Sequence, residues 1–204
     1  MHSKFASVLL AGVIALAALP SSVAAAQNTD AVNPRAISSS EGQLSVAVTY
    51  NGILSGVITS PHFWMQGGNI QIHGQFCGGW GVVADISGAH IANINSSGVG
   101  LGLVTATFGP RYTWTSAHRR YSLFGQGLVG EAFGFDSFFP NPQGVQTDAR
   151  SLAVVAGGGL NYELHHHLAL RAIEADYVRT QLPNSTTNVQ NNVRFGVGIV
   201  FRFP

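Results

Sequence analysis

The sequence has very little charge. Only 9% of its 204 residues are charged and the formal net charge is +1, whereas about 25% of the residues of a typical soluble domain are charged. A solvated disordered chain needs many charges, and a basic nucleic-acid-binding protein needs a clear excess of Lys and Arg. Both classes are therefore excluded. A cytosolic helical domain also fits poorly, because the wet face of its helices needs many Lys and Glu.

Cysteine and long apolar runs are scarce as well. The single cysteine, Cys77, excludes an intramolecular disulfide framework. After residue 26, no apolar run approaches the length of about 20 residues that a membrane-spanning helix needs. If this chain meets a membrane, it must therefore cross it with strands. Glycine, in contrast to cysteine, is abundant, with 25 residues.

The N-terminus has the features of a secretory signal. Lys4 supplies a positive charge, residues 5–19 are almost entirely apolar, and three alanines end the segment at residue 26. The apolar run is too short for a membrane anchor. Because no cysteine lies near the cleavage point, a lipoprotein is not expected. We expect residues 1–26 to be a cleaved signal peptide, 27–41 a flexible polar leader, and 42–204 a single β-barrel domain.

From Leu44 onward the sequence alternates with a period of two, which is typical of strands with two different faces. The clearest alternation covers residues 44–50, 69–76, 80–87, 104–114 and 192–203. Three further strands are expected over residues 119–133, 150–162 and 167–180. Within the last of these the apolar set changes phase, which predicts one extra residue, a β-bulge, near Arg171–Ala172. The count is therefore eight strands.

The connections between these strands alternate in length. The short ones cover residues 77–79, 115–118 and 163–166, and the long polar ones cover 54–64, 88–98, 134–149 and 181–190. This pattern predicts an all-β, antiparallel, up-and-down barrel with tight turns at one end and loops at the other. Outer-membrane barrels have this organisation, with short periplasmic turns and longer extracellular loops.

The two faces of the strands favour lipid over water as the outer solvent. One face carries large apolar residues, while the other mixes Gly, Ser, Thr and Asn with a few charges, which suits the narrow interior of eight strands. A soluble cup would need the reverse arrangement. Aromatic residues also concentrate near the strand ends on the short-turn side, as in the aromatic belt of a membrane interface. The predicted belt consists of Phe76, Trp80, Tyr112, Trp114, Tyr121, Tyr162, Phe201 and Phe203.

With these features the chain resembles the small OmpA-like outer-membrane barrels over about 160 residues. The resemblance rests on the signal, the eight alternating segments and the final pattern Val193–Phe203. It implies that the barrel-assembly machinery reads the alternating C-terminal strand that ends in Phe203. This chain departs from the family by adding Pro204. It also lacks the peptidoglycan-binding domain of the longest members, so wall tethering is not implied.

Several charged residues fall on the face that would line the lumen. This predicted polar network consists of His73, Asp85, Arg111, Arg171, Glu174, Asp176 and Arg194. Buried charges are costly unless they are paired, so we expect ion pairs between Asp176 and Arg194 and between Asp85 and Arg111, which lie at similar heights. Three acids balance three arginines, which favours a structural plug. A narrow channel is the alternative, because an open aqueous pore needs a larger barrel.

Catalytic and cofactor sites are not predicted. Ser87, His90 and Glu131 lie near the loop end, but their spacing matches no hydrolase motif. In the run His165–His167 only alternate residues share a face of an extended chain, so it predicts a solvated turn and no metal centre. The three glycines at 157–159 are followed by neither a helix nor a lysine and therefore form no phosphate loop.

The sequence thus predicts a non-enzymatic outer-membrane protein that supports the envelope or contacts a surface through its loops. The candidate contact surface is the loop from Phe133 to Asp148, with Phe135, Phe138 and Phe139 exposed. The expected partners are outer-membrane lipid, the barrel-assembly machinery and an extracellular partner that the sequence does not name. No nucleic acid is expected. A small-solute channel and a lipid-modifying enzyme are the alternative functions.

Overall fold

A computed structural model describes residues 43–57, 62–116 and 120–203 of the chain. These residues belong to one compact unit, while the expected signal and leader, residues 1–41, lie outside them. The described residues form strands and contain no helix long and apolar enough to cross a membrane. The strands are β1 (Leu44–Ser55), β2 (Phe63–Cys77), β3 (Trp80–Ile91), β4 (Leu101–Thr115), β5 (Tyr121–Phe135), β6 (Phe139–Asn141), β7 (Gly144–Gln146), β8 (Ala149–His165), β9 (Leu168–Thr180) and β10 (Gln190–Phe203).

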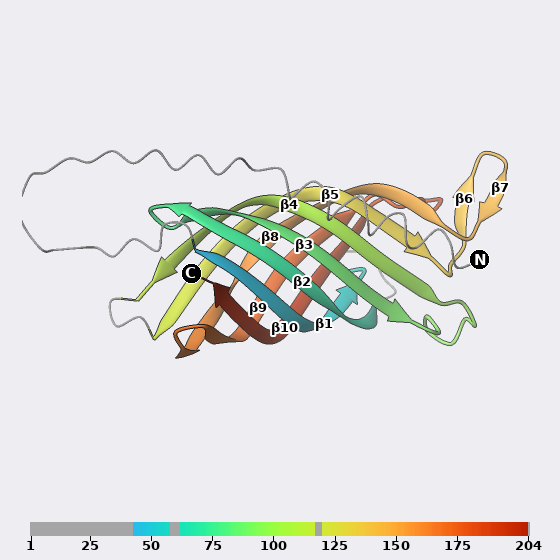
Figure 1. Cartoon of the computed structure of the whole chain (residues 1–204). Coiled ribbons are helices and arrows are strands. Elements are labelled where there is room, and N and C mark those ends of the chain that lie inside the picture. The colour runs from blue at the N-terminus through green and yellow to red at the C-terminus, as the bar shows by residue number, and fades with distance from the viewer. Residues whose placement is uncertain (1–42, 58–61, 117–119, 204) are drawn as a thin grey trace, which may run out of the picture. The chain divides into compact units, whose positions relative to one another are not determined.

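Eight of these strands close into a barrel. Its order is β1-β10-β9-β8-β5-β4-β3-β2, every neighbouring pair is antiparallel, and β1 pairs with β10 to complete the ring (Figure 1). Closure leaves no unpaired sheet edge. The predicted all-β, eight-stranded, up-and-down barrel is therefore confirmed.

The two ends of the barrel differ as the connection lengths predict. At one end, here called the turn end, the connections are residues 78–79, 116–120 and 166–167. Gly78 and Gly79 both have positive φ angles, 51° and 93°, which is the backbone of a tight two-residue hairpin turn. At the opposite loop end the connections are residues 56–62, 92–100, 136–148 and 181–189.

The third loop contains an element that the alternation did not predict. Strands β6 and β7 pair with each other in a separate two-stranded sheet, with Phe139 opposite Gln146 and Pro140 opposite Val145. Figure 1 shows this hairpin projecting beyond the loop end of the barrel. It lies between β5 and β8 in the chain and does not take part in the barrel ladder.

Strand β9 contains the predicted bulge. Glu174 pairs with Gly196 and Arg171 with Gly198, so two residues of β9 oppose one residue of β10. Ala172 is the additional residue, because Ile173 and Arg171 pair with the consecutive residues Leu160 and Asn161 of β8. The bulge lets Arg171 and Glu174 both point into the lumen, where each is 1% exposed.

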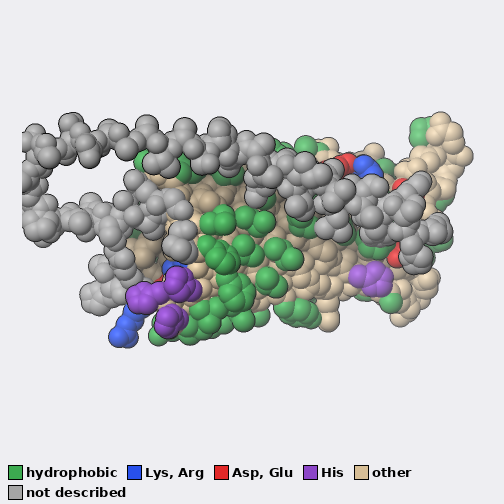
Figure 2. All heavy atoms as spheres, in the orientation of Figure 1, with side chains coloured by type: hydrophobic (Ala, Val, Ile, Leu, Met, Phe, Trp, Pro, Cys, Tyr) green, Lys and Arg blue, Asp and Glu red, His purple; other side chains and the backbone are tan. Residues whose placement is uncertain are grey.

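The faces of the strands show which solvent the barrel fits. Large apolar side chains point outward along the strands, and polar and charged side chains are buried inside. On the face shown in Figure 2, hydrophobic side chains cover the middle of the barrel, and the charged and histidine side chains in view lie toward its ends. This placement of apolar side chains outside and polar side chains inside is the reverse of that in a soluble barrel, so lipid is the outer solvent that this surface fits.

Candidate functional site: the lumen and the two rims

The structure buries all seven residues of the predicted polar network inside the barrel. Arg194 on β10 makes the densest set of contacts. Its Nη1 and Nη2 donate to Asp85 Oδ1 and Oδ2 at 3.1 and 3.0 Å, and its Nε and Nη2 donate to Asp176 Oδ2 at 3.1 and 2.7 Å. Arg194 thus joins β10 to neighbouring β9 and, across the lumen, to β3. Paired arginine and carboxylate groups can remain ionised in such an interior only because each satisfies the other.

The predicted pair between Asp176 and Arg194 forms, but the predicted pair between Asp85 and Arg111 is wrong. The register places Asp85 opposite Thr107 and Arg111 opposite Gly81, so the two side chains lie at different levels of adjacent strands. Asp85 pairs with Arg194 across the barrel. Counting residues from the turn end did not include the stagger between strands, which closure of a barrel requires.

Two glutamines that the sequence analysis did not single out connect the basic and acidic groups. The amide oxygen of Gln71 accepts from Arg111 and Arg171, both at 2.5 Å, and its nitrogen donates to Asp85 and Glu174. The oxygen of Gln126 accepts from Arg111, and its nitrogen donates to Glu174 and Asp176. An amide offers two donors and an acceptor, so each glutamine satisfies both signs of charge at once.

An aromatic ring and two glycines shape the turn-end part of this network. Arg111 and Arg171 lie over the ring of Phe124, with guanidinium carbons 4.3 and 4.6 Å from its centroid. A Cβ at Gly159 would lie 2.8 Å from that ring, and a Cβ at Gly157 would lie 2.3 Å from Asp176 Oδ1. These glycines therefore leave the space that the ring and the carboxylate occupy.

His73 is buried on β2 but stands apart from the ion pairs. Its Nδ1 lies 3.5 Å from Ser45 Oγ, and its Nε2 has no hydrogen-bond partner among the described residues. The ring lies against Gly81, where a Cβ would come within 2.4 Å of Nε2. His73 thus fills the lumen beside a glycine of the neighbouring strand.

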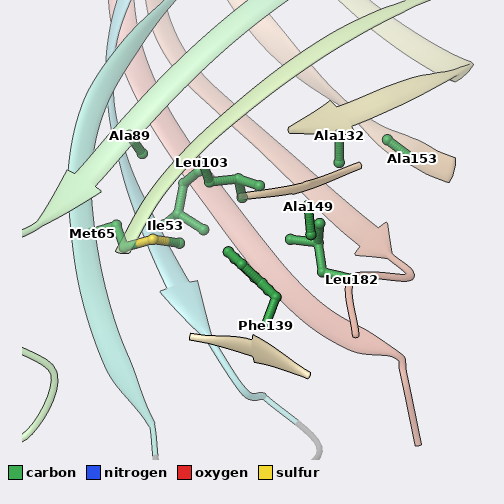
Figure 3. Close-up of a cluster of buried hydrophobic side chains, with 9 residues drawn as sticks. All are labelled: Ile53, Met65, Ala89, Leu103, Ala132, Phe139, Ala149, Ala153 and Leu182. Carbon is green, nitrogen blue, oxygen red and sulfur yellow. The ribbon is translucent and has the colours of Figure 1, made fainter. Parts of the chain in front are cut away.

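A second, apolar layer closes the lumen at the loop end, and we call it the apolar cap. Figure 3 shows its side chains pointing toward one another from the barrel wall and from two loops. The cap consists of Ile53, Met65, Ala89, Leu103, Ala132, Phe139, Ala149, Ala153 and Leu182. The alternation of small polar residues did not predict this layer, because the inward positions turn apolar only near the loop end.

Phe139 is the loop residue that completes the apolar cap, so its predicted exposure is wrong. It is 5% exposed, whereas its neighbour Phe138 is 65% exposed. Residues that follow one another on a strand point to opposite faces, and the hairpin turns Phe139 inward. A Cβ at Gly134 would lie 2.6 Å from the ring of Phe139, so this glycine makes room for it. Phe135 is half-buried and stacks on Phe133, with centroids 6.0 Å apart.

All eight side chains of the predicted aromatic belt are exposed on the outer face at the turn end. Trp80 and Tyr112 are cross-strand neighbours whose rings meet edge to face at 5.2 Å, and Tyr121 lies opposite Tyr162. A second outward group lies near the loop end and was not predicted, with Tyr50, Trp64 and Tyr177 exposed.

The separation of the two aromatic groups matches a membrane. From Trp64 to Phe76 on β2 the chain runs about 40 Å along the strand, which corresponds to roughly 30 Å along the axis at the usual tilt of a membrane barrel. The hydrocarbon core of a bilayer has about this thickness. The outer surface thus has an apolar band between two aromatic rims.

The structure does not assemble an enzyme or metal site from the residues considered above. Ser87 points into the lumen, whereas His90 and Glu131 are exposed on the outer face, so these three groups cannot act together. Among the residues that the structure describes, no group of three His, Cys, Asp or Glu side chains could hold a metal ion. Cys77 is an exposed free thiol at the turn end.

Comparison with known proteins finds similarity of fold. No protein-family model matches the chain, and no curated protein matches it. Neisserial surface protein A superimposes with a TM-score of 0.63 and 11% identity, covering 80% of this chain and all of the other. The attachment invasion locus protein Ail of Yersinia pestis superimposes with a TM-score of 0.55 and 19% identity, covering 80% of this chain and 99% of the other. The chain has the fold of the small eight-stranded outer-membrane β-barrels.

Proposed function

We propose that this protein is an outer-membrane barrel that supports the envelope and makes surface contacts through its extracellular loops. The observation that carries the proposal is the β6–β7 hairpin in the third loop. Phe139 anchors one face of the hairpin in the apolar cap, while Phe138 and Val145 are 65% and 66% exposed. Exposed apolar patches mark contact sites, and Phe138 and Val145 are the large apolar side chains that this hairpin exposes.

The filled lumen supports this role over solute passage. The ion network ties charged side chains from β3, β4, β9 and β10 to one another through Gln71 and Gln126. Nearer the loop end, the apolar cap closes the same interior a second time with Phe139 and Leu182 from the loops. A solute would have to separate buried ion pairs and also displace packed apolar side chains. A narrow channel is therefore the less favoured alternative.

The composition of the loops restricts the partner. The four loops contain no lysine or arginine, and their acids are Asp136 and Asp148. One structure of Ail from Yersinia pestis, with a TM-score of 0.55 and 20% identity, holds the heparin analogue sucrose octasulfate. Recognition of a sulfated ligand needs positive charge, which these loops lack. We therefore expect a partner with an apolar surface and not a polyanion.

The contact role can be tested with the full-length protein on the surface of a Gram-negative host that does not adhere. We expect cells with the wild-type barrel to adhere to cultured epithelial cells, and the double variant Phe138→Ser, Val145→Ser to lose most of this adhesion. Because both side chains are exposed, the substitutions should change the stability of the barrel by no more than about 0.5 kcal/mol.

Matched variants separate contact from stability. Thr186→Ala, in the fourth loop, should leave adhesion unchanged, whereas Phe139→Ala should destabilise the cap by about 3–5 kcal/mol. Adhesion that equals that of cells without the barrel, or that survives the double variant, would contradict the contact role. Single-channel recordings that show regular conductance steps for the wild type would instead favour the channel.

We also propose that the barrel-assembly machinery recognises the C-terminal strand. β10 closes the ring by pairing along β1, with Phe203 opposite Leu44, and the Phe203 side chain is exposed on the outer face. Phe203→Ala should reduce the yield of folded barrel in cells but should not reduce refolding of purified protein in detergent. An equal loss in both settings would show a structural role and refute recognition.

The proposed location includes an orientation and a processed N-terminus. The short turns would face the periplasm and the loops the exterior, after cleavage of the signal before Gln27. The mass of the protein purified from the outer-membrane fraction tests the cleavage directly. A mature chain that retains residues 1–26, or recovery only from the inner membrane, would refute this part of the proposal.

A further inference from the structure

The charged residues outside the lumen are distributed unequally between the two ends of the barrel. At the loop end Arg150 and Arg179 are accompanied by the acids Glu131, Asp136 and Asp148, whereas the turn end carries Arg120, three consecutive histidines at 165–167 and Arg202. All three histidines and Arg120 are exposed. In Figure 2 histidine side chains gather at one end of the barrel beside Lys or Arg side chains. We call these five residues the basic rim.

Main-chain hydrogen bonds hold the basic rim together across two turns and the end of β10. The Glu163 amide donates to the Arg120 carbonyl at 2.9 Å, which joins the turn before β5 to the end of β8. The Arg202 amide donates to the His167 carbonyl at 3.0 Å, which joins the next turn to β10. The rim therefore forms a continuous arc over neighbouring strands and is not a set of scattered side chains.

Little of this positive charge is neutralised. Glu163 is the acid at the turn end among the described residues, and it forms an ion pair with Arg202. Arg120 and the histidines have no such carboxylate partner in the described part of the chain. The rings of His165 and His166 meet edge to face with centroids 5.5 Å apart, so two imidazoles lie side by side on the surface.

The position of the basic rim relative to the aromatic belt indicates what it faces. Arg120 directly precedes Tyr121, and Arg202 lies between Phe201 and Phe203, all three of which belong to the belt. Aromatic belts mark the level of the lipid headgroups. Arg120 and the three histidines, in the turns just beyond this belt, are therefore at the depth of the phosphate groups, whereas Arg202 alternates with Phe201 and Phe203 and points inward.

We propose that the basic rim is a binding site for the headgroups of anionic phospholipids. The charges of the rim are complementary to phosphate, and arginine binds phosphate through paired N–H donors. The proposal rests on the membrane location proposed above but not on the surface-contact role. Each basic residue near an anionic membrane surface strengthens association about fivefold.

The test uses the full-length barrel in detergent with equal amounts of phosphatidylglycerol and phosphatidylcholine and a metal chelator. Native mass spectrometry then measures which lipid stays bound. We expect the wild type to prefer phosphatidylglycerol, and Arg120→Gln to lower this preference about fivefold. The matched control is Arg179→Gln, an exposed arginine near the loop end, which should have no effect. Gel mobility of unheated samples confirms that each variant is folded.

A second variant tests the histidines of the basic rim. The triple variant His165→Gln, His166→Gln, His167→Gln should also lower the preference for phosphatidylglycerol. Equal binding of both lipids by the wild type, equal losses in Arg120→Gln and Arg179→Gln, or full displacement by millimolar inorganic phosphate would each overturn the proposal. Because detergent has no inner or outer leaflet, such a failure is distinguishable from a wrong cellular location.

Discussion

Arg194→Met is the substitution that tests the lumen network most directly. Methionine fills a similar elongated space but has no charge and no N–H donor. It would remove all four hydrogen bonds that Arg194 donates to Asp85 and Asp176. The interior would change from three cations against three anions to two against three, and the excess negative charge would be buried.

The expected loss of stability depends on the carboxylates of Asp85 and Asp176, which remain in the lumen without Arg194. Removing one member of a buried ion pair costs about 3–5 kcal/mol, because the other charge is left uncompensated. Asp85 keeps the amide donors of Asn69 and Gln71, and Asp176 keeps that of Gln126, which limits the loss at each carboxylate. We therefore expect the free energy of unfolding to fall by about 4 kcal/mol.

The assay is reversible unfolding by urea in lipid vesicles, followed by tryptophan fluorescence. All three tryptophans lie exposed on the outer face of the barrel, so their emission changes when they leave the lipid. Arg194→Lys should give an intermediate loss, since a single ammonium cannot reproduce the forked contacts of a guanidinium. Arg179→Gln should change stability by no more than about 0.5 kcal/mol.

A compensating variant decides whether the loss of stability in Arg194→Met comes from the unpaired charge or from the change of side-chain shape. Adding Asp85→Asn to Arg194→Met leaves two cations against two anions at almost constant volume, and should recover at least about 2 kcal/mol. A loss below about 1 kcal/mol for Arg194→Met, or no recovery in the double variant, would refute the view that the network carries net electrostatic stability.

Two further predictions concern the barrel itself. Deleting Ala172 removes the bulge but leaves Arg171 and Glu174 two residues apart on the lumen face. Urea unfolding should therefore show a loss well below the roughly 2–4 kcal/mol of an arginine turned toward the membrane midplane, and a loss of that size would contradict the assigned bulge. Unheated protein on an SDS gel should also migrate differently from boiled protein, because a closed barrel has no edge at which unfolding can begin; identical mobility would argue against closure.

Much of the fold follows from local patterns in the sequence. Alternation with a period of two identifies strands without reference to their partners, and the chemistry of the two faces shows that the outer one meets lipid. The phase change in β9 likewise marks the bulge at Ala172 within a few residues. These features can be predicted from the sequence because each depends on residues that are close together in the chain.

The contacts inside the barrel depend on positions that are distant in sequence. Asp85 meets Arg194 and not Arg111, since the stagger of the strands and the width of the lumen decide which charges can reach each other. Gln126 escaped notice because it lies in a glycine-rich strand whose faces could not be assigned from its sequence. Gln71 lies on an assigned polar face, but its place between two arginines and two carboxylates requires the closed ring.

By itself, then, the sequence determined the number of strands in the barrel, the closed up-and-down architecture, the lipid-facing surface and the difference between the two ends. Only the tertiary structure decided which lumen charges pair and that Phe139 turns inward while Phe138 stays exposed. The physical reason is that a strand's faces are set by backbone geometry that every residue shares. The conformation of a loop and the register across a lumen are set by packing between segments that the chain brings together only when it folds.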